Sequence, residues 1–302
     1  MIHPPRVLLI AGPTSAGKSD VAVAVAERFD AVVLSADAMQ VYRGMDVGTG
    51  KVGPHERARA PHYGLDLVDP HEPFDAADFV RLADEVLARH PRVVVAGGTS
   101  LYLRALIRGL VPTPPVDPSL RAELEALPDL HERLAAVDPE LAARLHPHDR
   151  VRLVRGLEVF HATGRPLSAL QAEHAAAPDR VSAVGLWLDR ADLDARIDLR
   201  VRRMIDDGYV DEVRRLLDAG HDRSLKPMQS LGYRHLCDHL LDGLPLDEAA
   251  RRTCRDTRRF ARKQRNWMRV LGFPRVDAED HLPAALAAAS DTFGPARARA
   301  SG

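Results

Sequence analysis

Residues 7–19 read VLLIAGPTSAGKS, an apolar run followed by a short glycine-rich loop. The apolar run predicts a buried strand, and residues 20–29 (DVAVAVAERF) predict a helix whose first N–H groups point at an anion. Between them lies the complete G-x-x-x-x-G-K-[ST] pattern of a phosphate-binding loop, formed by Gly12, Pro13, Thr14, Ser15, Ala16, Gly17, Lys18 and Ser19. The sequence therefore predicts a strand, a loop and a helix that bind a phosphate-bearing ligand.

The composition of this loop indicates a phosphate site but not a reaction. Its backbone amides fit a diphosphate, and Lys18 brings a positive charge to the outer phosphate. The Ser19 hydroxyl is a candidate ligand for Mg²⁺. ATP-binding and other nucleotide-binding proteins share the pattern, so the rest of the chain has to identify the diphosphate.

The composition bounds the class of protein. A chain of 302 residues that is 45% hydrophobic can bury one large α/β core and a smaller second unit, and its net charge of -1 gives no global attraction to a polyanion. The two cysteines, Cys237 and Cys254, have no C-x-x-C neighbour, which argues against a disulfide framework and a zinc site. No apolar run approaches about 18 residues, and residues 1–6 are too short for a signal peptide. We expect a cytoplasmic protein outside the membrane.

Strands alternate with helices through the first third of the chain, which predicts a doubly wound parallel sheet. The predicted strands are residues 7–11, 31–34 and 92–96, and the predicted helices are 18–29 and 75–90. Ligands of such sheets bind at the carboxyl ends of the strands. The phosphate loop, Ser35-Ala36-Asp37 and Gly97-Gly98-Thr99 follow the three strands and are therefore expected to line one crevice.

A proline-rich break at residues 111–118 precedes a block that reads as wholly helical. The predicted helices there are 119–127, 130–137, 139–145 and 150–163, and a strand returns at 181–189. An all-helical block between two strands indicates an insertion, so we expect a catalytic core from 1–113 and 180–302 around a helical domain at 114–179. The last part of the core predicts one or two helices at 193–219, further helices at 232–241 and 247–271, and a disordered tail at 294–302.

Asp37 ends the second strand beside the phosphate loop. A carboxylate at this place can hold Mg²⁺ through water or act as the general base for an incoming nucleophile. The alternative is a cap for a following helix.

Gly97-Gly98-Thr99 stands where a nucleotide hydrolase usually carries an aspartate for Mg²⁺, and a guanine-reading N-K-x-D stretch is also absent from the sequence. Two glycines allow the backbone to approach a ligand closely, and Thr99 can donate to a phosphate or a base.

Two groups of arginines carry local charge. Arg196 and Arg200 lie four residues apart on one helix face, where they can clamp an oxyanion or form an ion-pair ladder with Asp192, Asp194 and Asp198. Residues 251–269 hold nine basic residues and one acid, Asp256. Six of these residues fall within about 40° of one line on a helix and are called the arginine stripe: Arg251, Arg255, Arg258, Arg262, Arg265 and Arg269. A stripe of this kind, with almost no acids beside it, favours contact with a nucleic-acid backbone. Cys254, Phe260, Ala261, Trp267 and Met268 are expected on the other side.

Together these motifs resemble the bacterial tRNA dimethylallyltransferases, or IPP transferases. The resemblance runs from about residue 7 to residue 272, and its motifs occur in the order GPTSAGKS, SADAMQVYRGMDVGTGK, PHYGLDLVDP, AGGTSLY, RLVRGLEVFHATGRPLS, LGYR and TRRFARKQRNW. Ala38 stands where the family often has serine, and Gly156 stands where it has alanine, which loosens a helix slightly.

The resemblance implies a P-loop NTPase-like parallel sheet flanked by helices, with an inserted all-helical subdomain. It implies transfer of a dimethylallyl group from dimethylallyl diphosphate to N6 of the adenosine immediately 3′ of the anticodon in tRNA, with release of pyrophosphate. Mg²⁺ is the implied cofactor, and the tRNA anticodon stem-loop and dimethylallyl diphosphate are the implied partners. Nothing in the sequence indicates an obligate protein partner.

The resemblance also implies roles for single residues. Asp37 is the expected base, and Thr14, Lys18 and Arg200 are expected to stabilise the leaving pyrophosphate. Residues 114–179 are expected to grip the tRNA. The residues expected to contact tRNA are Asp37, Ala38, Met39, Gln40, Thr99, Arg121, Arg152, Arg155, Arg258, Arg262 and Gln264.

Three alternatives are open on the residues alone. A small-molecule or nucleotide kinase would use Lys18 and Arg200 for ATP and Asp37 to activate a hydroxyl. An enzyme that prenylates free adenine nucleotides would not need the arginine stripe. A nucleotide-gated RNA-binding protein without catalysis would need a γ-phosphate sensor, which the sequence does not resemble.

Overall fold

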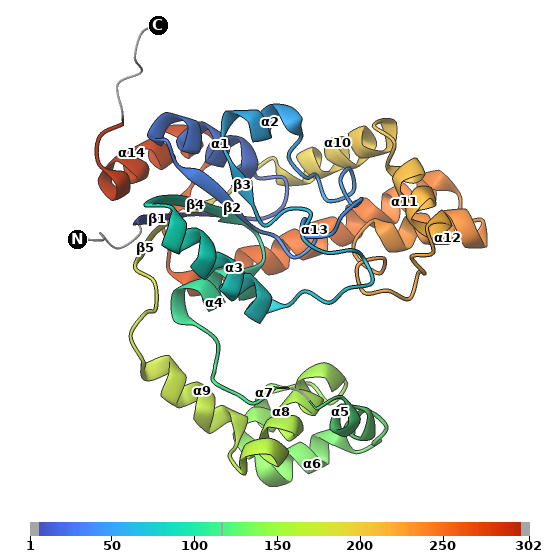
Figure 1. Ribbon diagram of the computed structural model, residues 1–302. Helices are drawn as coiled ribbons and strands as arrows, with labels where there is room; N and C mark the ends of the chain where they lie inside the picture. The colour runs from blue at the N-terminus through green and yellow to red at the C-terminus, as the bar shows by residue number, and fades with distance from the viewer. Residues whose placement is uncertain (1–5, 116, 297–302) are drawn as a thin grey trace, which may run out of the picture. The chain divides into compact units, whose positions relative to one another are not determined.

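The computed structural model describes residues 6–115 and 117–296 (Figure 1). The chain divides into two compact units, a core from residues 1–107 and 181–302 and a smaller unit at 108–180. The predicted insertion, 114–179, lies inside the smaller unit. Residues 1–5 and residues 297–302 of the predicted tail lie outside the described residues.

A parallel sheet of six strands in the order β3-β2-β4-β1-β5-β6 forms the centre of the core. This confirms the predicted parallel sheet. The strands are β1 (Arg6–Ala11), β2 (Val32–Ala36), β3 (His62–Tyr63), β4 (Arg92–Gly97), β5 (Ala183–Leu188) and β6 (Arg275–Val276). The two edge strands were not predicted, because two residues carry no alternation that a sequence pattern can reveal.

Helices cover both faces of this sheet, which explains why its central strands are largely apolar. Val7 and Leu9 of β1 pack on one face with α3 (Ala76–Arg89), α4 (Ser100–Arg108) and the end of α13 (Leu246–Leu271). Leu8 and Ile10 pack on the other face with α1 (Lys18–Phe29) and α14 (His281–Phe293).

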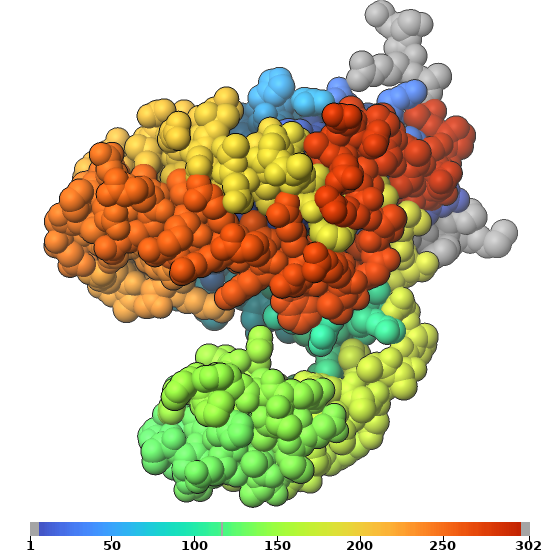
Figure 2. All heavy atoms as spheres, turned by 180° about the vertical axis from the view of Figure 1, so that it is seen from behind, coloured from blue at the N-terminus to red at the C-terminus, as the bar shows by residue number. Residues whose placement is uncertain are grey.

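A further helical layer extends from the carboxyl ends of the strands. It contains α10 (Leu193–Asp206), α11 (Tyr209–Asp218) and α12 (Tyr233–Asp242), whereas the short α2 (Pro54–Arg59) contacts α1. The predicted segment 193–219 is two helices, because Gly208 adopts a left-handed conformation with φ of 94° between them. The long α13 contacts both α10 and α12, and Figure 2 shows α12 and α13 in orange, α10 in yellow and α14 in red.

The smaller unit has its own apolar core, in which five helices meet. Gly156 lies under Leu134 and Leu141, and a Cβ at this position would lie 2.7 and 2.9 Å from their side chains. The glycine therefore permits close packing of these helices, in addition to lowering helix propensity. The helices are α5 (Pro118–Glu125), α6 (Leu130–Val137), α7 (Pro139–Arg144), α8 (Arg150–Thr163) and α9 (Leu167–Ala176).

The end of the described chain is more ordered than the sequence indicated. After a short 3-10 helix at Ala278–Asp280, α14 packs its alanines against α1, and only 294–296 of the predicted tail are described, in an irregular conformation. Across 6–115 and 117–296, none of the helices is both long and apolar enough to cross a membrane.

Candidate active site

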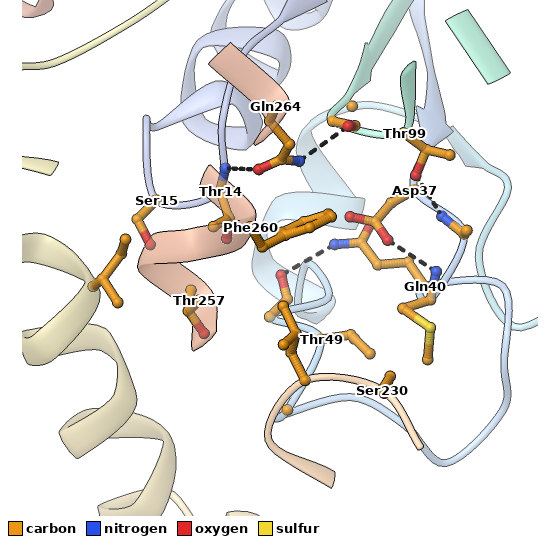
Figure 3. Close-up of a pocket in the computed structure, with 18 of the residues that line it drawn as sticks. Thr14, Ser15, Asp37, Gln40, Thr49, Thr99, Ser230, Thr257, Phe260 and Gln264 are labelled. Carbon is orange, nitrogen blue, oxygen red and sulfur yellow. Dashed lines mark hydrogen bonds between the residues drawn. The ribbon is translucent and has the colours of Figure 1, made fainter. Parts of the chain in front are cut away.

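One cavity of about 830 Å³ opens at the carboxyl ends of the central strands. The phosphate loop, the segment after β2 and the Gly97-Gly98-Thr99 turn all line it, as the predicted topology requires (Figure 3). Helices α10 and α13 supply much of the remaining wall.

The phosphate loop is held in a conformation that glycine makes possible. Gly12 has a φ of 156°, and a Cβ there would lie 2.4 Å from the carbonyl oxygen of Leu188. Gly17 has a φ of 93° and is the N-cap residue that precedes α1. The Ser15 hydroxyl is buried and has no hydrogen-bond partner among the described residues. An unsatisfied buried hydroxyl in this loop points to a polar ligand.

Lys18 begins α1, and its ammonium donates a hydrogen bond of 2.7 Å to the Pro13 carbonyl. Burial lowers the pKa of Lys18 to about 8; nearby Asp37 opposes this shift and Arg200 adds to it. Because the lowered pKa reflects the lack of solvent around the cation, an anion in the loop would favour the protonated form again.

The two arginines of α10 both reach the phosphate loop. Arg196 Nε donates to the Ser15 carbonyl at 3.1 Å, and Arg200 donates to the Thr14 hydroxyl at 3.5 Å and to the Thr49 carbonyl at 3.1 Å. Burial lowers the pKa of Arg200, while Asp37 opposes that shift. Lys18 and Arg200 thus bring two positive charges to the same wall as Asp37.

The contacts of α10 argue against the alternative in which Arg196 and Arg200 form a ladder of ion pairs with acids of their own helix. Asp192 pairs with Arg190, and Asp198 pairs with Arg258 of α13. Two of the three acids are therefore engaged elsewhere, which favours the clamp.

Asp37 lines the cavity, and its Oδ1 accepts the Met39 N–H at 2.9 Å. The residues that follow form a turn, so the alternative role as a helix cap is wrong. Thr99 fixes the same turn, because its hydroxyl oxygen accepts the Ala38 N–H at 3.0 Å and its own N–H donates to the Ala36 carbonyl at 3.2 Å.

Gln40 connects two parts of the wall. Its Oε1 accepts from the Ser35 hydroxyl at 2.8 Å, and its Nε2 donates to the Gly50 carbonyl at 3.3 Å. The amide is therefore oriented by both ends of the loop that it belongs to.

Gln264 of α13 lies where the phosphate loop meets the end of β4. Its Oε1 accepts the Thr14 N–H at 2.9 Å, and its Nε2 donates to the Gly98 carbonyl at 3.0 Å. The side chain is buried, with both ends of its amide used inside the protein, so the arrangement does not favour the predicted contact of Gln264 with tRNA. Gly98 is needed here for packing, since a Cβ would lie 2.3 Å from the Gln264 Nε2.

Gly97 also serves packing between loops. A Cβ on Gly97 would lie 2.2 Å from the carbonyl oxygen of Ala36 on the neighbouring strand. The sequence predicted that the two glycines allow the backbone to approach a ligand closely. In the structure they allow close contact with other parts of the protein, namely Ala36 and Gln264.

Glu212 of α11 holds a loop of this wall, a role that no sequence pattern indicates. Its carboxylate is 2% exposed and accepts the N–H groups of Asp46, Val47 and Gly48 at 2.8, 2.7 and 3.0 Å. The Tyr233 hydroxyl donates to the same carboxylate at 2.7 Å. Four donors to one buried carboxylate fix the loop firmly.

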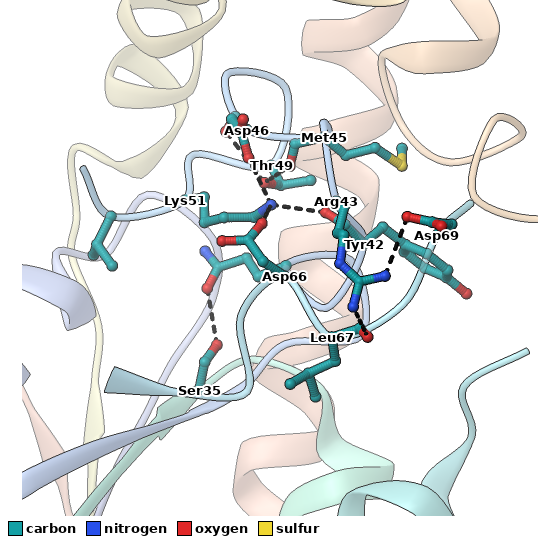
Figure 4. A network of polar contacts seen from close by, with 12 residues as sticks. Ser35, Tyr42, Arg43, Met45, Asp46, Thr49, Lys51, Asp66, Leu67 and Asp69 are labelled. Carbon is teal, nitrogen blue, oxygen red and sulfur yellow. Dashed lines mark hydrogen bonds and ion pairs between the residues drawn. The ribbon is translucent and has the colours of Figure 1, made fainter. Parts of the chain in front are cut away.

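Lys51 holds the other end of that loop (Figure 4). Its side chain is 1% exposed, and the ammonium donates to the Tyr42 carbonyl at 2.7 Å and to Asp46 and Asp66 at 2.6 Å each. Arg57 pairs with the same Asp66 at 2.9 Å, and these contacts lower the pKa of Asp66 against the opposing effect of its burial. The loop that carries Gln40 and Thr49 is therefore clamped at two points.

The arginine stripe of α13 is only partly available to a ligand. Arg258 pairs with Asp198, and Arg265 pairs at 2.8 Å with the buried Asp189. Acids on other elements, which the local sequence does not reveal, neutralise these two arginines. Phe260 and Trp267, expected on the other side of the helix from the stripe, are exposed and line the cavity.

The predicted RNA-binding arginines of the smaller unit all have acidic neighbours. Arg121 and Arg155 both pair with the buried carboxylate of Glu158, at 2.6 and 3.2 Å. Arg152 is well exposed and pairs with Asp149 at 3.1 Å.

The clamp at Glu212 predicts a large effect of removing its charge. In Glu212→Gln an amide NH₂ would replace one acceptor of the backbone N–H groups, so we expect the free energy of unfolding to fall by about 2–4 kcal/mol. Urea denaturation measures this change, and amide hydrogen exchange should accelerate at residues 46–48.

Asp211→Asn on the same helix is the control, because its carboxylate is exposed and pairs only with Arg214. We expect a change within about 0.5 kcal/mol there. Equal stability of the two variants would show that Glu212 does not clamp the loop.

Comparison with known proteins places this site in a family. The family model described as IPP transferase matches residues 40–270, and the model described as isopentenyl transferase matches residues 5–62. A tRNA dimethylallyltransferase of Geobacter metallireducens is 49% identical over 276 residues, covering 87% of this chain and 89% of the relative. One from Citrifermentans bemidjiense is 47% identical over 270 residues, with coverage of 87% and 88%.

Solved structures agree with these relatives. The full-length tRNA isopentenylpyrophosphate transferase of Bacillus halodurans has a TM-score of 0.66 and 33% identity, covering 95% of this chain and 98% of that one. A eukaryotic dimethylallyltransferase acting on tRNA has a TM-score of 0.79 and 26% identity, with coverage of 91% and 74%. The sheet with its flanking helices is therefore the P-loop NTPase-like fold that the sequence predicted, and the chain belongs to the tRNA dimethylallyltransferase family of IPP transferases.

Proposed function

We propose that the protein transfers a dimethylallyl group from dimethylallyl diphosphate to N6 of the adenosine immediately 3′ of the anticodon in tRNA and releases pyrophosphate. The observation that carries this proposal is the shared cavity of Asp37 and the phosphate loop, in which a carboxylate and a loop of phosphate-binding pattern line the same space. Family membership supports the same reaction.

The phosphate loop would hold the diphosphate. When the bond between the allylic carbon and oxygen breaks, negative charge grows on the leaving pyrophosphate. The Lys18 ammonium, the Arg200 guanidinium and the Thr14 hydroxyl line the cavity beside the loop and would stabilise that charge.

Mg²⁺ fits this site as a partner of the diphosphate. Among the residues that the structure describes, no group of three His, Cys, Asp or Glu side chains can hold a metal ion. Mg²⁺ commonly binds one or two protein oxygens together with phosphates and water, and the exposed Ser19 hydroxyl in the loop offers one such oxygen. When bound, Mg²⁺ would neutralise charge on the pyrophosphate.

Asp37 would act as the base. The N6 amine of adenine is a poor nucleophile, because its lone pair is delocalised into the ring. A carboxylate within reach of the amine accepts its proton as the new bond to carbon forms. Hydrogen bonds of Met39 to Asp37 and of Ala38 to Thr99 hold the turn that would position the carboxylate for this step.

The prenyl group would lie against the apolar part of the wall. Ile197 and Val201 of α10 are buried, and they line the cavity together with Met204 and Leu231. Because Ile197 is one turn from Arg200, the same helix would contact the diphosphate and the carbon chain.

The target adenosine has to leave its stack to reach this cavity, and an unpaired anticodon loop makes that step less costly than in a duplex. We propose that Asp37, Ala38, Met39, Gln40 and Thr99 lie near the extruded base. Arg262 and Arg152 are the exposed cations among the predicted RNA contacts. Arg152 pairs with Asp149, and Arg121, Arg155 and Arg258 pair with Glu158 or Asp198, so these four would bind RNA in competition with their acidic partners. The smaller unit would grip the anticodon stem.

A product assay distinguishes this reaction from its alternatives. We expect label from dimethylallyl diphosphate to appear in tRNA when AMP and ATP are also present, and a tRNA with guanosine at the target position to stay unlabelled. Label in AMP would instead identify an enzyme acting on free nucleotides. Phosphate transfer from ATP would identify a kinase.

Substitution of Asp37 tests its role as the base. Asp37→Asn keeps an oxygen for the Met39 N–H, whereas Asp37→Ala removes the carboxyl group; we expect both to lower kcat by roughly 10²–10⁴-fold. Isothermal titration with an unreactive prenyl thiodiphosphate should give the wild-type Kd. Glu85→Gln, on the far exposed side of α3, is the matched control. Wild-type turnover in Asp37→Ala would remove Asp37 from this role.

The lowered pKa of Lys18 predicts a pH dependence of diphosphate binding. Below pH about 8 the ammonium is charged in the empty site, so affinity for the thiodiphosphate is high there. Above that pH binding has to take up a proton, and we expect affinity to fall by roughly tenfold per pH unit. Titration calorimetry in buffers of different ionisation enthalpy measures the proton uptake.

Lys18→Met provides the comparison for this measurement. Its affinity should be lower and nearly independent of pH between about 7 and 9.5, because no ammonium titrates. The same pH dependence in wild type and variant would exclude Lys18 as its source.

A further inference from the structure

One face of α13 is not explained by the contacts described above. Phe260 and Trp267 are 41% and 42% exposed, more than is usual for aromatic rings. Both line the cavity that holds Asp37, and Figure 3 shows the Phe260 ring pointing from α13 into that cavity. Exposed apolar rings at the wall of a cavity indicate a ligand surface.

Two cations share this face. At about 100° per residue, Arg259, Phe260, Lys263 and Trp267 fall within an arc of about 100°, and all four line the cavity. We call these four residues the aromatic row. It is centred about 130° from the arginine stripe, so it is a separate surface of the same helix.

The cations of the aromatic row differ from the paired arginines of the stripe. Arg259 contacts Asp256 only at 3.6 Å, and Asp256 is shared with Arg234 and Arg255 at shorter distances. Lys263 has no acidic partner within residues 6–115 and 117–296. Positive charge therefore remains available next to the two rings.

We infer that the aromatic row binds unpaired RNA bases, with Phe260 stacking on the extruded adenine and Trp267 on a neighbouring base. This inference rests on the proposed function, because it requires an RNA substrate. Base stacking on aromatic rings combined with nearby cations is the usual way in which proteins bind single-stranded nucleic acid. Lys263 lies between the two rings along the helix, where an intervening phosphate would pass, and Arg259 lies beside Phe260.

The spacing of the rings supports two different bases. Phe260 and Trp267 are seven residues apart, which is about 10.5 Å along a helix axis. Stacked bases in one strand are about 3.4 Å apart, so the two rings cannot contact the same base. Since Phe260 points into the cavity where Asp37 lies, it is the ring that the reacting base would meet.

The prenyl group is a less suitable ligand for this surface. It is uncharged, and the buried residues Ile197 and Val201 of α10 already offer it an apolar wall. A surface with Lys263 between its rings and Arg259 beside Phe260 is instead complementary to alternating bases and phosphates.

The test uses an anticodon stem-loop RNA with 2-aminopurine at the target position. Phe260→Leu and Trp267→Leu keep apolar volume but remove the flat ring, so we expect RNA binding to weaken roughly ten- to hundredfold in each. Phe260→Tyr and Trp267→Phe should bind like the wild type. Fluorescence quenching on binding should be lost in Phe260→Leu and kept in Phe260→Tyr.

Salt dependence separates stacking from charge. The leucine variants lose no cation, so the slope of log Kd against log salt should stay at the wild-type value. Lys263→Ala should reduce that slope by about 0.7–0.9, as expected for the loss of one phosphate contact. Leu241→Ala, an exposed apolar residue of α12 outside the cavity, is the control and should bind RNA normally.

Three outcomes would overturn the inference. Wild-type RNA affinity in both leucine variants, with prenyl transfer to tRNA intact in the wild type, would refute the aromatic row and leave the proposed function standing. If the leucine variants bind the prenyl thiodiphosphate more weakly than the wild type but bind RNA with unchanged affinity, the rings contact the prenyl group instead. Failure of the wild-type protein to bind or prenylate tRNA would refute both proposals.

Discussion

The buried amide of Gln264 is the contact on which the arrangement of the cavity depends. It joins the Thr14 N–H of the phosphate loop to the Gly98 carbonyl at the end of β4, and its helix carries the Phe260 ring one turn away. A buried amide with both ends satisfied leaves little freedom for the segments that it connects. Three parts of the chain, about 250 residues apart at the extremes, are thereby fixed relative to one another.

The electrostatics of the site follow from that arrangement. Lys18 and Arg200 are partly buried beside Asp37, and this burial lowers the pKa of both cations. Charges held in a poorly solvated site interact strongly with charge that develops during a reaction. The loop clamped by Glu212 and Lys51 supplies the Thr49 carbonyl that orients Arg200, so residues outside the reaction determine where the cation lies.

The sequence predicted the parts of this protein that local patterns encode. The phosphate loop, the parallel sheet and the convergence of three loops follow from apolar runs and from the residues at their ends. Contacts between distant segments were not predictable: Glu212 and Lys51 look like ordinary surface residues, and Gln264 carries no signal that its amide will be buried. The alanine-rich α14 escaped notice because alanine gives almost no apolar periodicity.

The largest difference between sequence and structure lies in α13, and its cause is physical. A local pattern of arginines reveals charge but not the acids that other elements bring to it, such as Asp198 to Arg258 and Asp189 to Arg265. Conversely, an aromatic residue is expected in the core unless a cavity opens beside it, as one does at Phe260. The helix therefore uses part of its arginine stripe to hold α10 and β5, and turns a different face toward the cavity.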